Sequence, residues 1–269
     1  LFNVAAAMGG NGGIVEWQPE HGARIGVLDR GAPGDSVRWV EMDPFYVRRS
    51  KAEVLPNLPP KLYNRIYVDL APAQRRIYDE MRKDMLAWIN SLQAGEEPLV
   101  AAAIISKLQR LQMMAVGTPE FDSQGRVRLT DPSTKADAVM EILDDNEEEQ
   151  FVIFSQFKGP LRILRNRFDR TGITYGSFTG DDSNYVREVA KKEFISGNRR
   201  ILLGTIGSGG VGVDGLQHAS CNVIFIDRDW SPAVNDQAED RLHRGGQTRV
   251  VNVYDIMARD TVDFDRMQR

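Results

Sequence analysis

Phe151-Val-Ile-Phe154 and Asn222-Val-Ile-Phe-Ile226 are the two stretches that decide the fold. Both are short, almost uninterrupted apolar runs, which are typical of strands buried on both faces of a parallel sheet. Segments with helical spacing alternate with such runs from residue 135 onward. This alternation predicts an α/β fold in which a parallel sheet carries flanking helices.

The other elements are placed by working outward from these two strands. Further strands are expected near 175 and at 201–203 and 250–254, and helices at 135–145, 159–171, 184–196 and 232–243. Upstream, the glycine-rich first 40 residues show no sustained period and are expected to be irregular; a strand at 62–70 and helices at 72–89 and 101–115 follow. The pattern changes near residue 130. We therefore expect a first domain at 1–130, which includes a helical protrusion, and an α/β domain at 131–269.

Composition narrows the class of protein. The 269 residues are 42% hydrophobic and 27% charged with a formal net charge of -4, which is typical of a globular protein and not of a uniformly basic nucleic-acid binder. The single cysteine excludes an intrachain disulfide, and no apolar run reaches the roughly 18 residues of a membrane span. These features predict a soluble, intracellular protein. Because Leu1 is not a start methionine and no signal pattern follows, we expect a fragment of a longer protein.

A glycine-rich segment, Gly207-Ser-Gly-Gly-Val-Gly212, follows the strand expected at 201–203. It satisfies the GxGxxG pattern, so a dinucleotide-binding oxidoreductase domain is one alternative. That pattern requires a full helix after the glycines, whereas only nine residues separate Gly212 from Asn222. The other interpretation is a loop at the carboxyl end of a parallel strand. There, glycine amides and the hydroxyls of Thr205 and Ser208 approach phosphate oxygens.

A second phosphate-binding pattern is Gln237-Ala-Glu-Asp-Arg-Leu-His-Arg-Gly-Gly-Gln247. Residues three or four apart are neighbours on a helix, so Gln237, Arg241 and Arg244 are expected to share one helix face. Two guanidinium groups that point the same way match the oxygens of a phosphate. The pattern therefore predicts a site for phosphate.

Seven segments occur in the order found in one protein family. They are Arg48-Arg-Ser-Lys51 with Leu58-Pro-Pro-Lys61, Leu70-Ala-Pro-Ala-Gln74 with Tyr78, Phe154-Ser-Gln-Phe157, Thr179-Gly180 with Arg187 and Phe194, Thr205 to Gly212, Asp227 to Pro232, and Gln237 to Gln247. With them the chain resembles the second, C-terminal RecA-like lobe of Swi/Snf-type DNA translocases in helicase superfamily two. The resemblance implies half of a DNA-dependent ATPase that moves on duplex DNA.

The resemblance also implies roles for individual residues. Arg241 and Arg244 are expected to act as arginine fingers on ATP. A second set is expected to lie beside the nucleotide or to support the fingers: Gln237, Gly209, Gly210, Gly212, Asp214 and Gln247. Contacts with the DNA backbone, insensitive to base sequence, are expected from Ser155, Gln156, Thr179, Gly180, Thr205, Ser208, Trp230, Arg48 and Arg49.

Two departures from the family pattern affect this assignment. After Gly212 the family commonly continues Leu-Asn-Leu, whereas this chain has Val213-Asp-Gly215. Asp214 is therefore expected to bind a ribose or to cap the loop. Arg228 and Asp229 stand where the family usually has a proline and a second tryptophan.

The sequence contains no GxxxxGK[ST] and no Asp-Glu-x-Asp/His motif, which hold the phosphates and the magnesium ion of ATP. In this family both motifs belong to the first lobe. We therefore expect ATP with Mg2+ as the cofactor, with the metal held by the missing lobe. Duplex DNA and the N-terminal RecA-like lobe of the same protein are the expected partners, and the isolated chain is expected to be inactive. A non-enzymatic DNA-binding or interaction module is the alternative.

Overall fold

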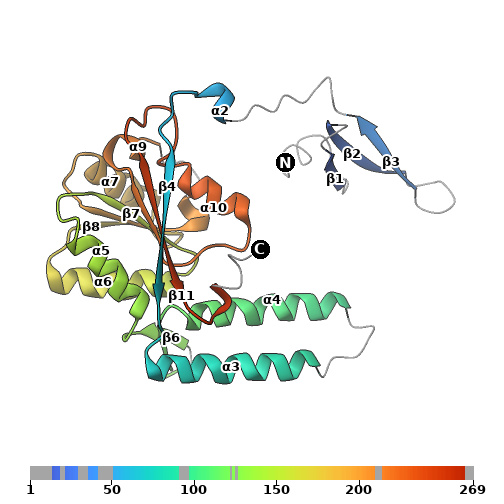
Figure 1. Cartoon of the computed structure of the whole chain (residues 1–269), viewed down its shortest axis with the longest axis horizontal. Helices are drawn as coiled ribbons and strands as arrows, with labels where there is room; N and C mark the ends of the chain where they lie inside the picture. Colours follow the sequence, from blue (N-terminus) through green and yellow to red (C-terminus); the bar gives the residue numbers. More distant parts are fainter. Residues whose placement is uncertain are drawn as a thin grey trace. The chain divides into compact units, whose positions relative to one another are not determined.

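The computed structural model divides the chain into two units, Leu1–Pro56 and Asn57–Arg269 (Figure 1). It describes residues 14–18, 22–29, 36–41, 51–90, 97–121, 123–124, 127–209 and 214–263. The expected boundary near residue 130 therefore falls inside the second unit. Its strand at 61–68 belongs to the same sheet as the later strands, which is why the unit begins so early.

The first unit contains a small antiparallel sheet. Its strands are β1 (Ile14–Gln18), β2 (Gly22–Asp29) and β3 (Ser36–Glu41), in the order β1-β2-β3, and a short helix α2 (Lys51–Val54) follows. The expectation of an irregular first segment was wrong. Glycine-rich composition obscured the alternation in Ser-Val-Arg-Trp-Val-Glu of β3, which was the signal for a strand.

The second unit is built on a six-stranded sheet in the order β4-β11-β10-β7-β9-β8 (Figure 1). Every pair of neighbouring strands is parallel, which confirms the predicted parallel α/β sheet. The strands are β4 (Lys61–Val68), β7 (Phe151–Ser155), β8 (Tyr175–Phe178), β9 (Ile201–Thr205), β10 (Asn222–Phe225) and β11 (Val251–Ala258).

Helices of this unit cover the sheet and extend beyond it. They are α3 (Pro72–Asn90), α4 (Glu97–Met114), α5 (Thr134–Asp144), α6 (Lys158–Thr171), α7 (Asn184–Ile195), α8 (Ile206–Gly209), α9 (Leu216–Ala219) and α10 (Pro232–Glu239). A hairpin of β5 (Thr118–Phe121) and β6 (Val127–Thr130) lies between α4 and α5 in the sequence. Ser133 caps α5 and Ser183 caps α7, each by accepting a backbone N–H.

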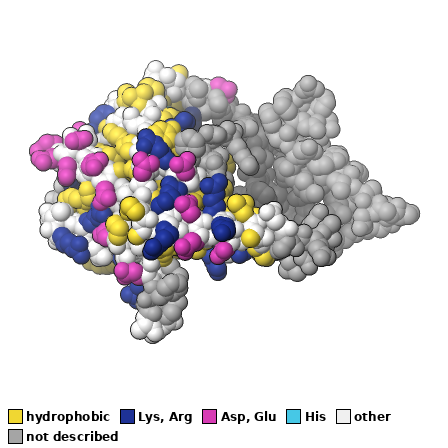
Figure 2. Space-filling view, turned by 60° about the horizontal axis from the view of Figure 1, so that its bottom comes forward, with side chains coloured by type: hydrophobic (Ala, Val, Ile, Leu, Met, Phe, Trp, Pro, Cys, Tyr) yellow, Lys and Arg dark blue, Asp and Glu magenta, His cyan; other side chains and the backbone are white. Residues whose placement is uncertain are grey.

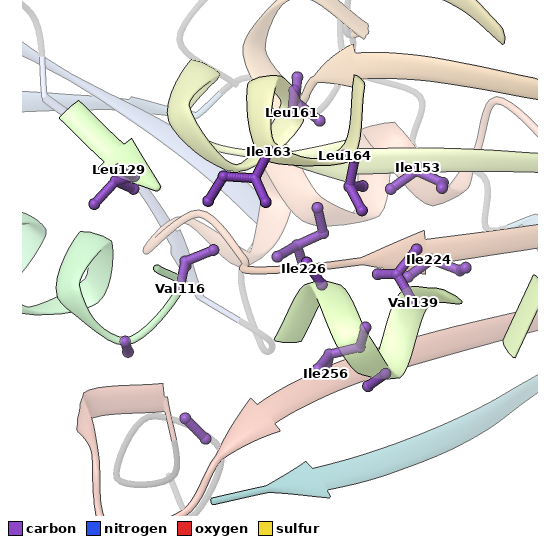
Figure 3. Close-up of a cluster of buried hydrophobic side chains, with 14 of the residues drawn as sticks. Val116, Leu129, Val139, Ile153, Leu161, Ile163, Leu164, Ile224, Ile226 and Ile256 are labelled. Carbon is purple, nitrogen blue, oxygen red and sulfur yellow. The ribbon is translucent and has the colours of Figure 1, made fainter. Parts of the chain in front are cut away.

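Two hydrophobic clusters lie on the two faces of the sheet, because successive side chains of a strand point to opposite faces. Strand β7 contributes Phe151 and Ile153 to one cluster and Val152 and Phe154 to the other. The first cluster includes apolar residues of α5 and α6, and Figure 3 shows part of it. The second includes residues of α7, α9 and α10. The result is a layered α/β/α core.

The helices α3 and α4 project from the rest of the unit as a helical protrusion (Figure 1), and buried side chains hold their bases. Gln74 Nε2 donates to the carbonyl of Met114 at 2.8 Å, and Gln112 Nε2 donates to the carbonyl of Arg228 at 2.6 Å. The hydroxyl of Tyr78 accepts from the backbone N–H of Val262 at 2.8 Å. The first contact joins the two helices, and the other two attach the protrusion to the segments that follow β10 and β11.

Candidate nucleotide and DNA site

Four loops meet at one edge of the sheet. They follow β7, β8, β9 and β10, which are neighbours in the order β10-β7-β9-β8. Because these strands are parallel, their carboxyl ends lie at the same edge, where open α/β sheets bind ligands. The structure therefore brings together five residues that were predicted to contact DNA: Ser155, Gln156, Thr179, Gly180 and Thr205.

The loop after β7 is held by the loop after β10. Asp227 is buried, and its two carboxylate oxygens accept from Ser155 Oγ and from the backbone N–H of Gln156, each at 2.6 Å. Gln156 Nε2 donates to Asp229 at 3.2 Å. The Ser155 side chain is fully buried, so it supports the turn and cannot meet DNA as predicted. Gln156 is partly exposed and stays a candidate.

A buried ion pair lies beneath this loop, and the sequence analysis missed it. Lys135 is fully buried; its Nζ lies 2.5 Å from Asp263 Oδ2 and donates to the carbonyl of Ile226 at 2.7 Å. Burial raises the pKa of Asp227 to about 6, against the opposing effects of Lys135 and of the hydrogen bonds from Ser155 and Gln156. The position of Lys135 four residues before Val139, on the apolar face of α5, was the available signal.

The loop after β8 is fixed by Asp182. Its Oδ2 accepts from Ser177 Oγ at 2.7 Å, from Thr179 Oγ1 at 2.7 Å and from the Thr179 backbone N–H at 2.6 Å. Burial opposes ionisation, but these hydrogen bonds outweigh it and lower the pKa of Asp182. The Thr179 side chain is 3% exposed and is used inside the loop, contrary to a direct DNA contact. Gly180 is exposed, and its backbone is the accessible part.

The arginine motif does not form the regular helix that was expected to run to residue 243. Helix α10 ends at Glu239, and the N–H groups of Arg241 and Leu242 donate to carbonyls three residues back, at 3.2 and 3.0 Å. The chain then turns through Gly246, at φ 94°, a conformation that favours glycine. Arg241 and Arg244 therefore lie in consecutive turns after the helix and do not share a helix face.

Long-range contacts hold the last residue of α10. The Glu239 carboxylate is 2% exposed and accepts from Lys61 Nζ at 2.6 Å, from Tyr63 Oη at 2.9 Å and from Arg228 Nη1 at 2.5 Å. Arg228 also pairs with Asp255 at 2.6 Å. These bonds tie the last turn of the helix to β4 and to the loop after β10. They also give Arg228, a departure from the family pattern, a structural role.

The two arginines have different surroundings. The Arg244 side chain is 38% exposed and forms an ion pair with Asp214, which is 75% exposed. Arg241 is partly buried beside a small cavity on the sheet face that contains Phe154, Phe178 and Leu216. The exposed part of the Arg244 side chain is accessible to an incoming anion.

The other residues that were predicted to lie beside the nucleotide or the DNA have different positions. Gln237 is exposed on α10, whereas Gln247 is 5% exposed. The side-chain amide of Gln247 donates to Ser220 and Leu242 carbonyls and accepts from two backbone N–H groups, so it braces the turn and is not placed to contact a nucleotide. Ser208 and Gly209 end α8. Gly210, Gly212, Arg48 and Arg49 lie outside the described residues.

Trp230 lies at the rim of a cavity of about 320 Å³, with Tyr63, Arg65 and Asp236 among the other lining residues. It is 37% exposed, so it is not a core aromatic. Its predicted contact with DNA stays a prediction.

Comparison with known proteins gives the family. Residues 134–246 match the helicase conserved C-terminal domain. An uncharacterised ATP-dependent helicase of Mycoplasma pneumoniae is 34% identical over 223 residues, which cover 82% of this chain and 21% of that protein. The Sulfolobus solfataricus SWI2/SNF2 ATPase core domain is 26% identical with a TM-score of 0.64, over 84% of this chain and 46% of that chain. The structure of the same core in complex with dsDNA is also 26% identical, with a TM-score of 0.62, over 84% of this chain and 47% of that chain.

The chain contains a C-terminal RecA-like lobe of the Swi/Snf type. The part that matches the helicase domain begins with α5 and includes the edge loops and the arginine turn. The dinucleotide alternative is not supported, because the four-residue helix α9, and not a full helix, precedes β10 in the part of the chain described after the glycines. No helix among the described residues combines the length and the apolar character needed to span a membrane. The chain spans about a fifth of the length of the Mycoplasma relative that it matches.

Proposed function

We propose that this lobe is half of a DNA-dependent ATPase that couples ATP hydrolysis to movement along duplex DNA. One observation carries the proposal: the match to the helicase C-terminal domain extends from 134 to 246, so it includes both the loops at the sheet edge and the arginine turn. The names of the relatives support the ATP-dependent activity, and the solved core with dsDNA supports duplex DNA as the track.

The arginine turn fits a phosphate ligand. The Arg244 guanidinium already holds an oxyanion, the carboxylate of Asp214, at a solvent-accessible position. Phosphate oxygens are the same class of ligand for a guanidinium. When bound, ATP with Mg2+ supplies the terminal phosphoryl group that is hydrolysed. Arg244, with Arg241 beside the sheet, neutralises the charge that develops on that group.

The magnesium ion is assigned to the other lobe. Within the described ranges, no three His, Cys, Asp or Glu side chains gather to form a metal site. We place the lysine loop and the metal-binding carboxylates on an N-terminal RecA-like lobe. ATP lies between the two lobes, and this chain supplies the arginine side.

The edge loops supply the grip on DNA. Gln156 and Thr205 are partly exposed and Gly180 is exposed, all at the carboxyl ends of neighbouring strands. Such groups contact backbone phosphates without reading bases. On the face drawn in Figure 2, basic and acidic side chains are interspersed over the described surface, so that face offers no extended basic surface for DNA. The grip is placed at the strand ends instead.

ATP turnover with duplex DNA tests the proposal. The protein with both lobes should hydrolyse ATP and should do so faster when DNA is added, whereas the present chain alone should show no turnover above the buffer rate. Turnover by the chain alone at the rate of the two-lobed protein contradicts the half-site. A two-lobed protein that binds DNA but never hydrolyses ATP favours the non-enzymatic alternative.

A further inference from the structure

The turn that carries Arg244 touches the segment that follows the glycine-rich loop at three points. Arg244 Nη1 forms an ion pair with Asp214 Oδ1. Gln217 Nε2 donates to the carbonyl of Gly245 at 3.5 Å. A Cβ at Gly246 would lie 2.8 Å from Cε1 of His218, so the backbone there packs directly on that ring. At this point the two segments form one packed unit.

The position of Asp214 is fixed by the backbone that follows it. Gly215, at φ 97°, is the N-cap residue of α9, and its N–H donates to Gln217 Oε1 at 3.1 Å. A positive φ of this size favours glycine and sets the direction of the chain. The carboxylate of Asp214 is therefore presented to the arginine turn by a defined local structure.

The Asp214–Arg244 pair is open to solvent. The two side chains are 75% and 38% exposed, respectively, so an anion can reach the edge of the guanidinium that the carboxylate occupies. Carboxylate and phosphate oxygens bind that edge through the same kind of hydrogen bond. One guanidinium edge cannot serve both in full, so the two anions compete.

We propose that Asp214 is a positioning residue for Arg244, which holds the guanidinium while no phosphate is bound and is replaced by phosphate oxygens when nucleotide binds. The inference rests on the proposed function, because it requires that Arg244 meets phosphate.

Binding of inorganic triphosphate to the chain, measured by titration calorimetry at low salt, tests this exchange. Asp214→Asn keeps the shape of the side chain and removes its charge. Asp236→Asn is the matched control, because Asp236 is an exposed carboxylate on α10 and its loss changes the net charge equally. We expect Asp214→Asn to bind triphosphate about threefold to fivefold more tightly than Asp236→Asn, since exposed ion pairs contribute little more than that. Equal binding by the two variants, or weaker binding by Asp214→Asn, overturns the proposal.

The variant Arg244→Gln tests whether Arg244 binds phosphate at all, separately from the exchange with Asp214. Equal triphosphate binding by the wild type and Arg244→Gln, including no detectable binding by either, overturns the present inference; the proposed function is tested separately, by ATP turnover of the two-lobed protein. If Arg244→Gln weakens binding but Asp214→Asn gives no gain over its control, only the present inference fails. Asp214→Asn should also give no gain in the Arg244→Gln background, and a gain that persists there contradicts the exchange.

Discussion

Asp227 accepts a hydrogen bond from Ser155 Oγ at 2.6 Å, although the two residues are 72 positions apart in the chain. The bond joins the ends of β10 and β7, and the second oxygen of the same carboxylate accepts from the Gln156 N–H. Two segments that the sequence assigned separately to the DNA track are thus one structure. Asp227 and Ser155 are buried and hold the two segments together, and Gln156 is partly exposed at the surface.

The buried carboxylate of Asp227 should make the free energy of unfolding depend on pH. Its pKa is raised from 3.8 to about 6, so between these values the folded protein binds a proton that the unfolded chain does not. The contribution of Asp227 to the free energy of unfolding therefore falls as pH rises through this window. The difference in that free energy between wild type and Asp227→Asn should decrease by about 2–3 kcal/mol from pH 4 to pH 7, at about 1.4 kcal/mol per pKa unit. Urea unfolding at both pH values measures it, and a difference that grows with pH contradicts the account.

Loss of Lys135 should destabilise the lobe strongly. Lys135→Met leaves Asp263 as a buried carboxylate without its cation partner, a change that typically costs about 3–5 kcal/mol. Lys158→Met is the matched control, because the Lys158–Asp181 pair is 58% and 70% exposed and such pairs contribute about 0–1 kcal/mol. Urea unfolding of both variants at pH 7 measures the loss in the free energy of unfolding. Similar losses for the two variants would show that the buried pair stabilises the lobe no more than the exposed pair does.

The glycine of the arginine turn should not tolerate a side chain. At Gly246 the φ is 94° and an added Cβ would lie 2.8 Å from the His218 ring. Gly172 has a similar φ of 76° but open space around it. Gly172→Ala should cost about 1–2 kcal/mol through backbone strain alone, and Gly246→Ala should cost more. Thermal unfolding of the two variants tests the order, and a smaller loss at Gly246 would speak against the packed turn.

The sheet could be predicted from sequence because its signal is local. The apolar runs at β7 and β10 are buried on both faces, and nothing distant was needed to recognise them. The end of α10 could not be predicted in this way. Its last residue, Glu239, is held by Lys61, Tyr63 and Arg228, of which two lie on a strand more than 170 residues away.

The candidate site could likewise be predicted only in part. The pattern predicted which loops meet, since parallel strands bring their carboxyl ends to one edge. It did not predict which side chains of those loops are free to act. Ser155, Thr179 and Gln247 were chosen as ligand contacts, but their polar atoms are bonded to Asp227, Asp182 and the backbone around Ser220, respectively. Those partners are fixed only when the fold is complete.

The most direct test of the central claim, that Arg244 serves ATP and not DNA, is a paired measurement on the two-lobed protein. DNA-stimulated ATP turnover and duplex-DNA affinity are measured for the wild type, for Arg244→Ala and for Arg170→Ala, an exposed arginine on α6 that serves as the control. Arg244→Ala should lower turnover by about a thousandfold or more, as expected for an arginine finger, with DNA affinity unchanged within about twofold of the control. Equal loss of turnover and DNA affinity, or turnover equal to that of Arg170→Ala, would contradict the account.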